Sequence, residues 1–240
     1  LAINYETETD DGHTLRKGDY RVWHENRFLY APEVKIRIFI RSFMWSLFDA
    51  EEGKPICNSV QKLSLDGVFN DTLGGNRCGR LVKEEAAKLT DDDPRLVTSK
   101  AVQCNQVIYG VLSGKMKEAD GTEVQLDNLP IISYFKKSGY MPMNNFIRGL
   151  ADRKKIIPRV EVNLKTSKAK KGSVTFFVPV PTEGKSLTSL SDEDKILIRM
   201  FKDTIDASNV NVMQKHNEVL RGNVSDEDSD LSKDFDAAIT

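Results

Sequence analysis

The sequence predicts a mainly β protein of the α+β class, built as an antiparallel barrel or curved sheet with helical additions and a C-terminal helical segment. Residues 33–49 contain no Gly or Pro and are dense in β-branched and aromatic side chains, which is typical of one long strand. Residues 160–164 and 173–180 alternate apolar and polar side chains on either side of a turn, which indicates a hairpin. Helical spacing is clearest after residue 190.

The charge of the chain is unevenly distributed. Its 240 residues suit one large domain, or one domain with appendages. Residues 225–240 hold six acids and one base, which gives this segment −5, and subtracting it from the total of −1 leaves +4 on the remainder. The body is therefore mildly basic and the tail acidic. No apolar run approaches the ~20 residues that a membrane span needs, so we expect no membrane association.

The first third of the chain is expected to consist mostly of strands. Residues 1–18 are polar and lack periodicity, which predicts a flexible arm or an edge segment. Residues 20–23 and 27–31 are predicted to be two short strands around a His-Glu-Asn turn. Residues 56–65 are predicted to pair back on the long strand, and the four glycines in residues 66–80 predict a long loop.

The middle of the chain mixes both element types. Residues 81–89 are predicted to form a short helix that ends at an Asp-Asp-Asp-Pro run. Residues 101–112 are predicted to form a strand, in which Gly110 indicates a bulge or a close approach of another backbone. Residues 131–137 and 144–154 have helical character, the second range beginning at a capping Asn.

The last part of the chain is predicted to leave the sheet. Pro179 and Pro181 are expected to end the hairpin, since proline lacks the N–H that a strand ladder needs. The Ser-Asp-Glu-Asp sequence at 191–194 marks a helix start. We expect helices within residues 183–222 and an acidic, disordered tail over residues 223–240.

The long strand at residues 33–49 carries the first candidate binding surface. Because side chains alternate across a strand, its even positions form a largely apolar core face. The odd positions mix cations, which neutralise phosphates, with rings, which stack on bases. These odd positions are Lys35, Arg37, Phe39, Arg41, Phe43 and Trp45. The alternative is a strand covered on both faces, with its Lys and Arg stems passing between apolar neighbours.

The turn of the predicted hairpin carries the second candidate surface. Four lysines fall within seven residues before Gly172, namely Lys165, Lys168, Lys170 and Lys171. A lysine-rich hairpin can follow a phosphate backbone, with an affinity that depends on salt through counterion release. The alternative is an ordinary solvated turn.

The sequence offers no recognisable catalytic or cofactor motif. No H-E-x-x-H, G-x-S-x-G or phosphate-loop sequence occurs, so we expect a non-enzyme that needs no cofactor. Cys57, Cys78 and Cys104 with a histidine such as His216 supply enough ligand types for zinc, but no C-x-x-C pair is present. The odd number of cysteines favours free structural thiols in a reducing compartment, and we predict no metal site.

Taken in order, these features resemble the OB-fold single-stranded DNA-binding proteins of tailed bacteriophages, over about residues 19–182. The features that carry the resemblance are the 34–48 strand, the Asn-Arg-Cys-Gly segment at 76–79, the 102–112 strand, the lysine-tipped hairpin and the acidic end. Some relatives hold zinc in the comparable insertion, where this chain has only Cys78.

This resemblance implies a protein of viral DNA replication or recombination that binds single-stranded DNA without sequence specificity. It further implies that the acidic tail recruits replication or recombination proteins, and that the protein acts in the cytoplasm of an infected host cell. The alternative from the sequence is a phage structural or adaptor protein, which uses its sheet and C-terminal helices for protein contacts.

Overall fold

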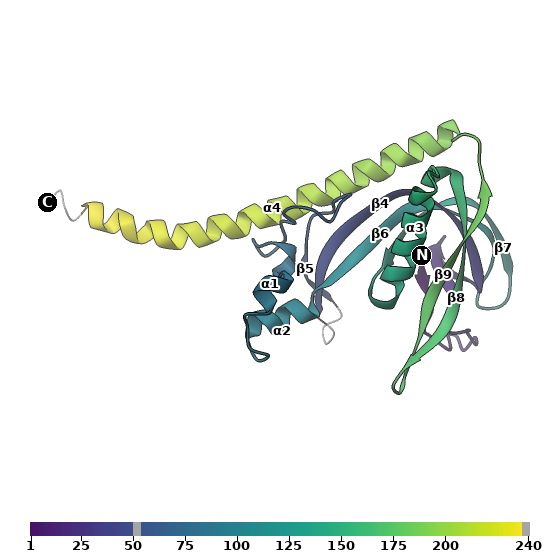
Figure 1. The fold of residues 1–240 in the computed structure, drawn as a ribbon, viewed down its shortest axis with the longest axis horizontal. Coiled ribbons are helices and arrows are strands. Elements are labelled where there is room, and N and C mark those ends of the chain that lie inside the picture. Colours follow the sequence, from purple (N-terminus) through teal and green to yellow (C-terminus); the bar gives the residue numbers. More distant parts are fainter. Residues whose placement is uncertain (50–53, 237–240) are drawn as a thin grey trace. The chain divides into compact units, whose positions relative to one another are not determined.

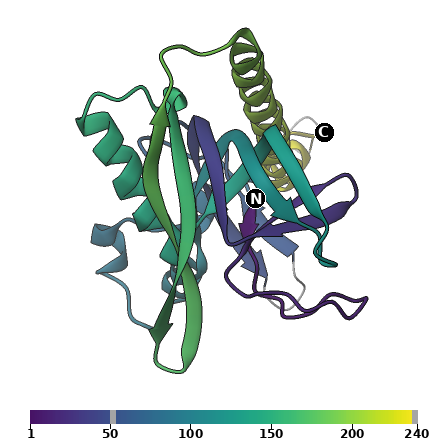
Figure 2. The same ribbon diagram turned by 90° about the vertical axis from the view of Figure 1, so that its right-hand side faces the viewer.

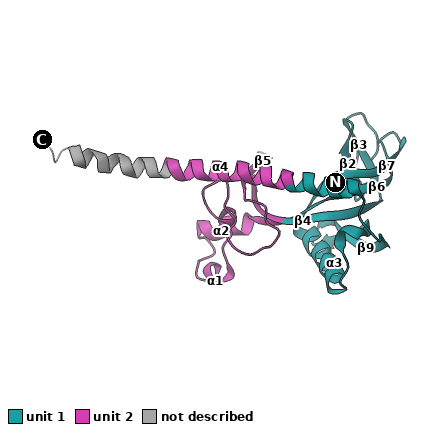
Figure 3. Cartoon of the chain, turned by 90° about the horizontal axis from the view of Figure 1, so that it is seen from above, with its two compact units in different colours: residues 1–42, 105–202 teal, residues 43–104, 203–240 magenta. Residues whose placement is uncertain are grey.

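The computed structural model describes residues 1–49 and 54–236, and side chains only as far as residue 222. It is mainly an antiparallel β-sheet protein with several helices, one of them C-terminal. The chain divides into two compact units (Figure 3). Unit 1 comprises Leu1–Ser42 and Asn105–Lys202, and unit 2 comprises Phe43–Cys104 and Asp203–Thr240.

The long strand β4 lies near the middle of the sheet (Figure 1). The bounds of the strands are β1 Ala2–Ile3, β2 Tyr20–His24, β3 Arg27–Ala31, β4 Glu33–Asp49, β5 Lys54–Asn58, β6 Gln103–Lys117, β7 Glu123–Phe135, β8 Val160–Lys171 and β9 Val174–Ser186. The spatial order is β1-β2-β3-β6-β4-β8-β9, with β7 paired to β6 and β5 paired to β4.

The helices are short apart from two. Their bounds are η1 Arg77–Gly79, α1 Lys83–Ala86, α2 Pro94–Ala101, η2 Lys137–Gly139, α3 Tyr140–Asp152, η3 Ile157–Arg159 and α4 Asp192–Asp236. None of the helices within the described ranges is both long and apolar enough to cross a membrane.

The core of unit 1 lies against the even face of β4, as the alternation of its side chains predicts. Val34, Ile36 and Ile38 are buried there. They belong to one apolar cluster that also includes Ile108 of β6 and Ile147 of α3. Burial of such side chains stabilises the fold by about 1.5–3 kcal/mol each, so this cluster fixes which face of β4 points inward.

Gly110 marks a close backbone approach, which confirms one of the two explanations predicted for a glycine in this strand. A Cβ atom added at Gly110 would collide with the main-chain oxygen of Arg37. Only a residue without a side chain therefore allows β6 to lie this close to β4.

Three boundary predictions were wrong. Residues 131–135 continue β7 instead of starting a helix, and their burial alternates along the strand opposite β6. β9 runs through Pro179 and Pro181, because it lies at the edge of the sheet, where a missing N–H is tolerated. α3 begins at Tyr140, one turn before the predicted capping Asn144.

The start of the chain forms the edge segment that was one of its two predicted states, and its C-terminal part is more regular than the sequence predicts. Residues 1–18 contribute the edge strand β1, and the buried Asn4 side chain donates hydrogen bonds to the main-chain oxygens of Glu6 and Arg16. α4 is one helix that continues through Gly222 to Asp236, since a single glycine costs a helix only about 1 kcal/mol. Residues 237–240 of the predicted tail lie outside the described residues.

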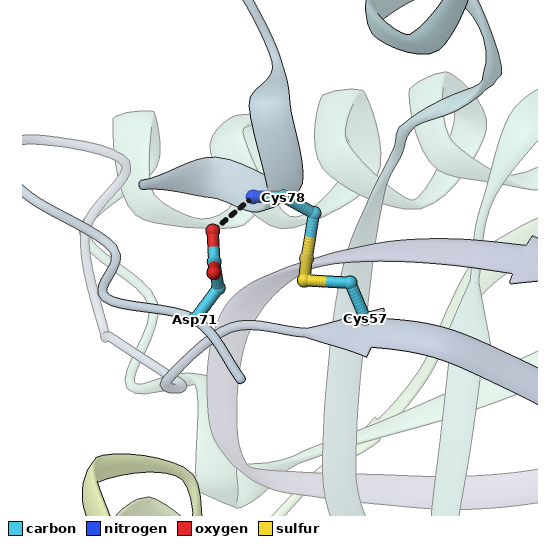
Figure 4. Close-up of side chains that lie close together, drawn as sticks. All are labelled: Cys57, Asp71 and Cys78. Atoms are coloured by element: carbon cyan, nitrogen blue, oxygen red, sulfur yellow. Dashed lines mark hydrogen bonds between the residues drawn. A yellow bond between two sulfur atoms is a disulfide. The ribbon is translucent and has the colours of Figure 1, made fainter. Parts of the chain in front are cut away.

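In unit 2 the predicted glycine-rich loop is wrapped around the carboxylate of Asp71. Its Oδ1 accepts hydrogen bonds from the main-chain N–H groups of Leu73 and Gly75, both at 3.0 Å. Its Oδ2 accepts one from the N–H of Cys78 at 2.7 Å (Figure 4). Cys78 adopts a left-handed backbone with φ of 51°, which turns its N–H toward this anion.

The prediction of free thiols is wrong for two of the three cysteines. Cys57 of β5 and Cys78 form a disulfide in unit 2 (Figure 4), and Cys104 lies outside that bond. β5 is also shorter than the predicted 56–65 strand, since after Asn58 the backbone makes only isolated bridges. The bond joins β5 to the loop that the sequence predicted between residues 66 and 80.

Cys57, Cys78 and Asp71 also form a group of possible metal ligands, which resembles the zinc site considered from the sequence. The two sulfurs and a carboxylate oxygen of Asp71 lie within 4.8 Å of one another. Those donors are already engaged, because the sulfurs bond each other and the carboxylate accepts three N–H groups. His216 has its Nδ1 3.0 Å from the main-chain oxygen of Asp71. These contacts support a structural role for the cluster.

Candidate nucleic-acid interface

The odd face of β4 is not the open stacking surface that the sequence predicted. Phe39 is 7% exposed and Phe43 is 4% exposed. In unit 1 the ring of Phe39 packs against Phe201 of α4, with ring centroids 6.4 Å apart. The prediction that these two rings stack on bases is therefore wrong, because packed side chains already cover them.

Arg37, predicted to contact phosphate, is held in an internal ion pair. Its two terminal nitrogens donate to the two carboxylate oxygens of Asp194, both at 2.7 Å, and the side chains are 12% and 6% exposed. Asp194 also exchanges hydrogen bonds with Ser191 in a capping box at the start of α4. The hydrogen bond from Arg37 is the main reason that the pKa of Asp194 lies below its usual range.

The remaining predicted residues of β4 do not restore a continuous platform. Lys35 is half-exposed in unit 1 and lies 3.8 Å from a carboxylate oxygen of Glu161. Arg41 is partly buried, and this burial lowers its pKa. Trp45 belongs to unit 2, where its partly buried ring packs edge-on against Phe69 at 6.4 Å. The Arg37 guanidinium does lie over the Phe39 ring, 5.1 Å from its centroid, but that ring is buried and that cation is paired with Asp194.

The β8–β9 hairpin presents the second set of predicted residues in the open. It extends beyond the neighbouring strands of unit 1, as two views of the ribbon show (Figures 1 and 2). All four of the predicted lysines are exposed. The Nζ atom of Lys165 lies 3.1 Å from a carboxylate oxygen of Glu33. Within the described residues, no carboxylate oxygen lies within ion-pair distance of Lys168, Lys170 or Lys171.

The pairing of the hairpin places lysine beside an aromatic ring. Lys168 lies directly across from Phe177, and Lys170 across from Thr175. Directly opposed residues of an antiparallel pair project from the same face. One face of the hairpin therefore combines two cations with a ring, which is the chemistry that the sequence predicted for β4.

This face lines a groove of about 870 Å³, here called the basic groove. Its wall is completed by Tyr5, by the 16–19 loop and by the start of β4. The charged residues of the lining are Arg16, Lys17, Asp19, Glu33, Lys165 and Lys168. These formal charges sum to +2, and within the described part of the chain Lys17 and Lys168 lie in no ion pair.

An aromatic pair, Tyr5 and Phe177, forms part of the lining of the basic groove. The ring centroids lie 5.9 Å apart at an interplanar angle of 64°. The main-chain N–H of Phe177 donates to the Tyr5 hydroxyl at 3.4 Å, which ties Tyr5 to the edge of the sheet. Gly18, with φ of +93°, packs so tightly on the Phe177 ring that an added Cβ atom would overlap it.

Sequence reasoning missed both rings of this pair. Tyr5 falls in the segment predicted to be a flexible arm, and it becomes part of the site only through a contact 172 residues along the chain. Phe177 carried a usable signal, because it follows the lysine-rich turn in a predicted strand. No protein-family model, curated protein or solved structure matches this chain.

Proposed function

We propose that this chain is a non-catalytic protein that binds single-stranded DNA without sequence specificity, through the basic groove and the lysines of the β8–β9 hairpin. The observation that carries the proposal is the juxtaposition of exposed lysines with the Tyr5–Phe177 pair on one wall of unit 1. Lysines supply sequence-independent phosphate contacts, and every base has a face that can stack on a ring.

The sequence resemblance adds two parts to this proposal. It suggests that unit 1 is a variant of the OB-fold, which is supported by curved antiparallel strands around an apolar interior partly filled by α3. It also suggests a role in viral DNA replication or recombination, with the acidic end recruiting partner proteins. These two parts rest on the resemblance and on charge, and the binding test below does not depend on them.

The test is the salt dependence of binding to a fluorescent dT oligomer, measured by anisotropy for two matched variants. Lys168→Ala/Lys170→Ala removes two hairpin lysines, whereas Lys115→Ala/Lys117→Ala removes two exposed lysines that both pair with Glu123. Each phosphate contact contributes about 0.7 to the slope of log K against log salt on single strands. We therefore expect the first variant to lower that slope by about 1.4 and the second to leave it unchanged.

Three results separate the outcomes. If both variants show the same slope, the phosphate contacts do not lie at the hairpin lysines. Absence of binding to DNA and to an RNA oligomer at low salt would overturn the proposal. Tighter binding to RNA than to DNA would keep the groove but change its ligand.

A structural or adaptor role remains the second candidate, because α4 exposes apolar side chains. In unit 1, Ile196 and Met200 lie one helical turn apart and are each 56% exposed. Neighbouring exposed apolar side chains are typical of surfaces that bind another protein. Light scattering that shows a defined assembly, unchanged by added oligonucleotide, would favour this role over DNA binding.

A further inference from the structure

A second cavity lies beside the basic groove in unit 1 and has a different chemical character. It encloses about 260 Å³ and shares Tyr5 and Phe177 with the basic groove, so the two rings stand between the cavities. Its other walls come from residues 1–3, Tyr20, the end of β7, the following turn and β9. We call this cavity the ring pocket.

The lining of the ring pocket is largely aromatic and apolar. It includes Leu1, Ile3, Tyr20, Tyr134, Phe135 and Pro179, and residues 136–139 complete the lining. Tyr134 is 53% exposed, so that side of the pocket is open to solvent. Pockets for drug-sized ligands begin at about 300 Å³, so this one suits a single planar ring system.

Each of the two cavities that share the Tyr5–Phe177 pair has an exposed lysine in its lining. Lys168 lies across from Phe177 and lines the basic groove, and Lys137 lines the ring pocket. A nucleotide chain has phosphates on both sides of each base, which matches a ring pair shared by two cavities that each have a lysine in their lining.

From these contacts we infer that the ring pocket accepts one unstacked base of a single strand whose flanking phosphates lie against Lys168 and Lys137. This inference rests on the proposed function and makes it more specific, because it requires a base and not only a phosphate backbone. It also excludes duplex DNA as a good ligand, since a paired base has to leave its stack before it can enter a pocket.

The experiment compares three fluorescent ligands of equal length at one salt concentration. They are a dT oligomer, the same oligomer with abasic sites at its central positions, and a duplex. Stacking of one base on aromatic side chains increases the affinity by about fivefold to hundredfold. We expect the abasic oligomer and the duplex to bind more weakly than dT by that factor.

Variants of Tyr5 test whether the base lies against the Tyr5 ring. Tyr5→Ala removes the ring shared by both cavities and is expected to weaken dT binding by a similar factor while leaving abasic binding unchanged. Tyr5→Phe keeps the ring and should bind dT as the parent does. Trp23→Ala is the matched control, because Trp23 is a similarly exposed ring on β2, at 56% against 49% for Tyr5, and lies outside the lining of the ring pocket.

The outcomes distinguish this inference from the proposal beneath it. If dT and the abasic oligomer bind equally and both remain salt-dependent, the base pocket is refuted and the phosphate groove stands. If Tyr5→Ala weakens both ligands equally, or if Tyr5→Phe is as weak as Tyr5→Ala, the base does not lie against this ring. If neither oligomer binds the parent, the proposed function itself is overturned.

Discussion

Two surfaces of unit 1 combine cations with aromatic rings, and only one of them is open. On β4, Arg37 bonds Asp194 and Phe39 packs against Phe201, so α4 covers this surface. On the β8–β9 hairpin, Lys168 and Phe177 face a groove. The residue types are nearly the same. The difference shows that an alternating pattern identifies a face of a strand, whereas a remote element decides whether that face binds a ligand or belongs to the core.

The largest expected effect tests the covered ring against the open one. Phe39→Ala should lower the free energy of unfolding by about 3–5 kcal/mol, because it removes a buried ring and leaves a cavity. Tyr5→Ala should lower it by about 1 kcal/mol or less, because that side chain is 49% exposed. Urea unfolding followed by circular dichroism measures both.

The same pair of variants should behave in the opposite way in DNA binding. At a temperature where both variants are folded, Phe39→Ala is expected to bind dT like the parent. If Phe39→Ala retains full stability and loses binding, then the ring of Phe39 contacts the ligand and the distinction between the two surfaces fails.

The sequence predicted the strands better than their ends, and it did not predict which candidate site residues other elements would cover. The 33–49 strand, its buried even face and the close approach at Gly110 followed from alternation and from the absence of a side chain. Residues 131–135 did not, because their partner strand determines their conformation. The cover over Phe39 was unpredictable for the same reason, since Phe201 lies 162 positions further along the chain. Local patterns cannot report such contacts.

The second prediction concerns the cation of the covered surface. Arg37→Ala leaves the largely buried carboxylate of Asp194 without its strongest partner and should destabilise the fold by about 3 kcal/mol. The double variant Arg37→Ala/Asp194→Ala should cost less than the sum of the two single variants, since they remove the same contact. Exact additivity in urea unfolding would show that the two groups do not interact.

The hairpin provides the comparison for that measurement. Lys168→Ala removes an exposed cation that, among the described residues, has no carboxylate partner, so its effect on unfolding should stay within about 0.5 kcal/mol. Its effect should appear instead in the salt dependence of oligonucleotide binding. A large loss of stability for Lys168→Ala would mean that the hairpin lysines are structural too.

The smallest expected effect is the pH dependence that Asp194 gives to the covered surface. The hydrogen bond from Arg37 holds the pKa of Asp194 below its ordinary value of 3.8 in the folded protein. The folded state therefore binds this proton less readily than the unfolded state, so the ion pair stabilises the protein fully above that value and progressively less as the pH falls through the folded pKa. Asp194→Asn should accordingly reduce the decline of unfolding free energy between pH 5 and pH 3, where each unit between the folded and unfolded pKa corresponds to about 1.4 kcal/mol. Asp91→Asn, at a side chain that is 98% exposed, is the control and should leave the decline as it is in the parent. If Asp194→Asn and Asp91→Asn give the same pH profile, Asp194 is not held in its charged form by Arg37, and the covered surface would then differ from the open one in packing alone.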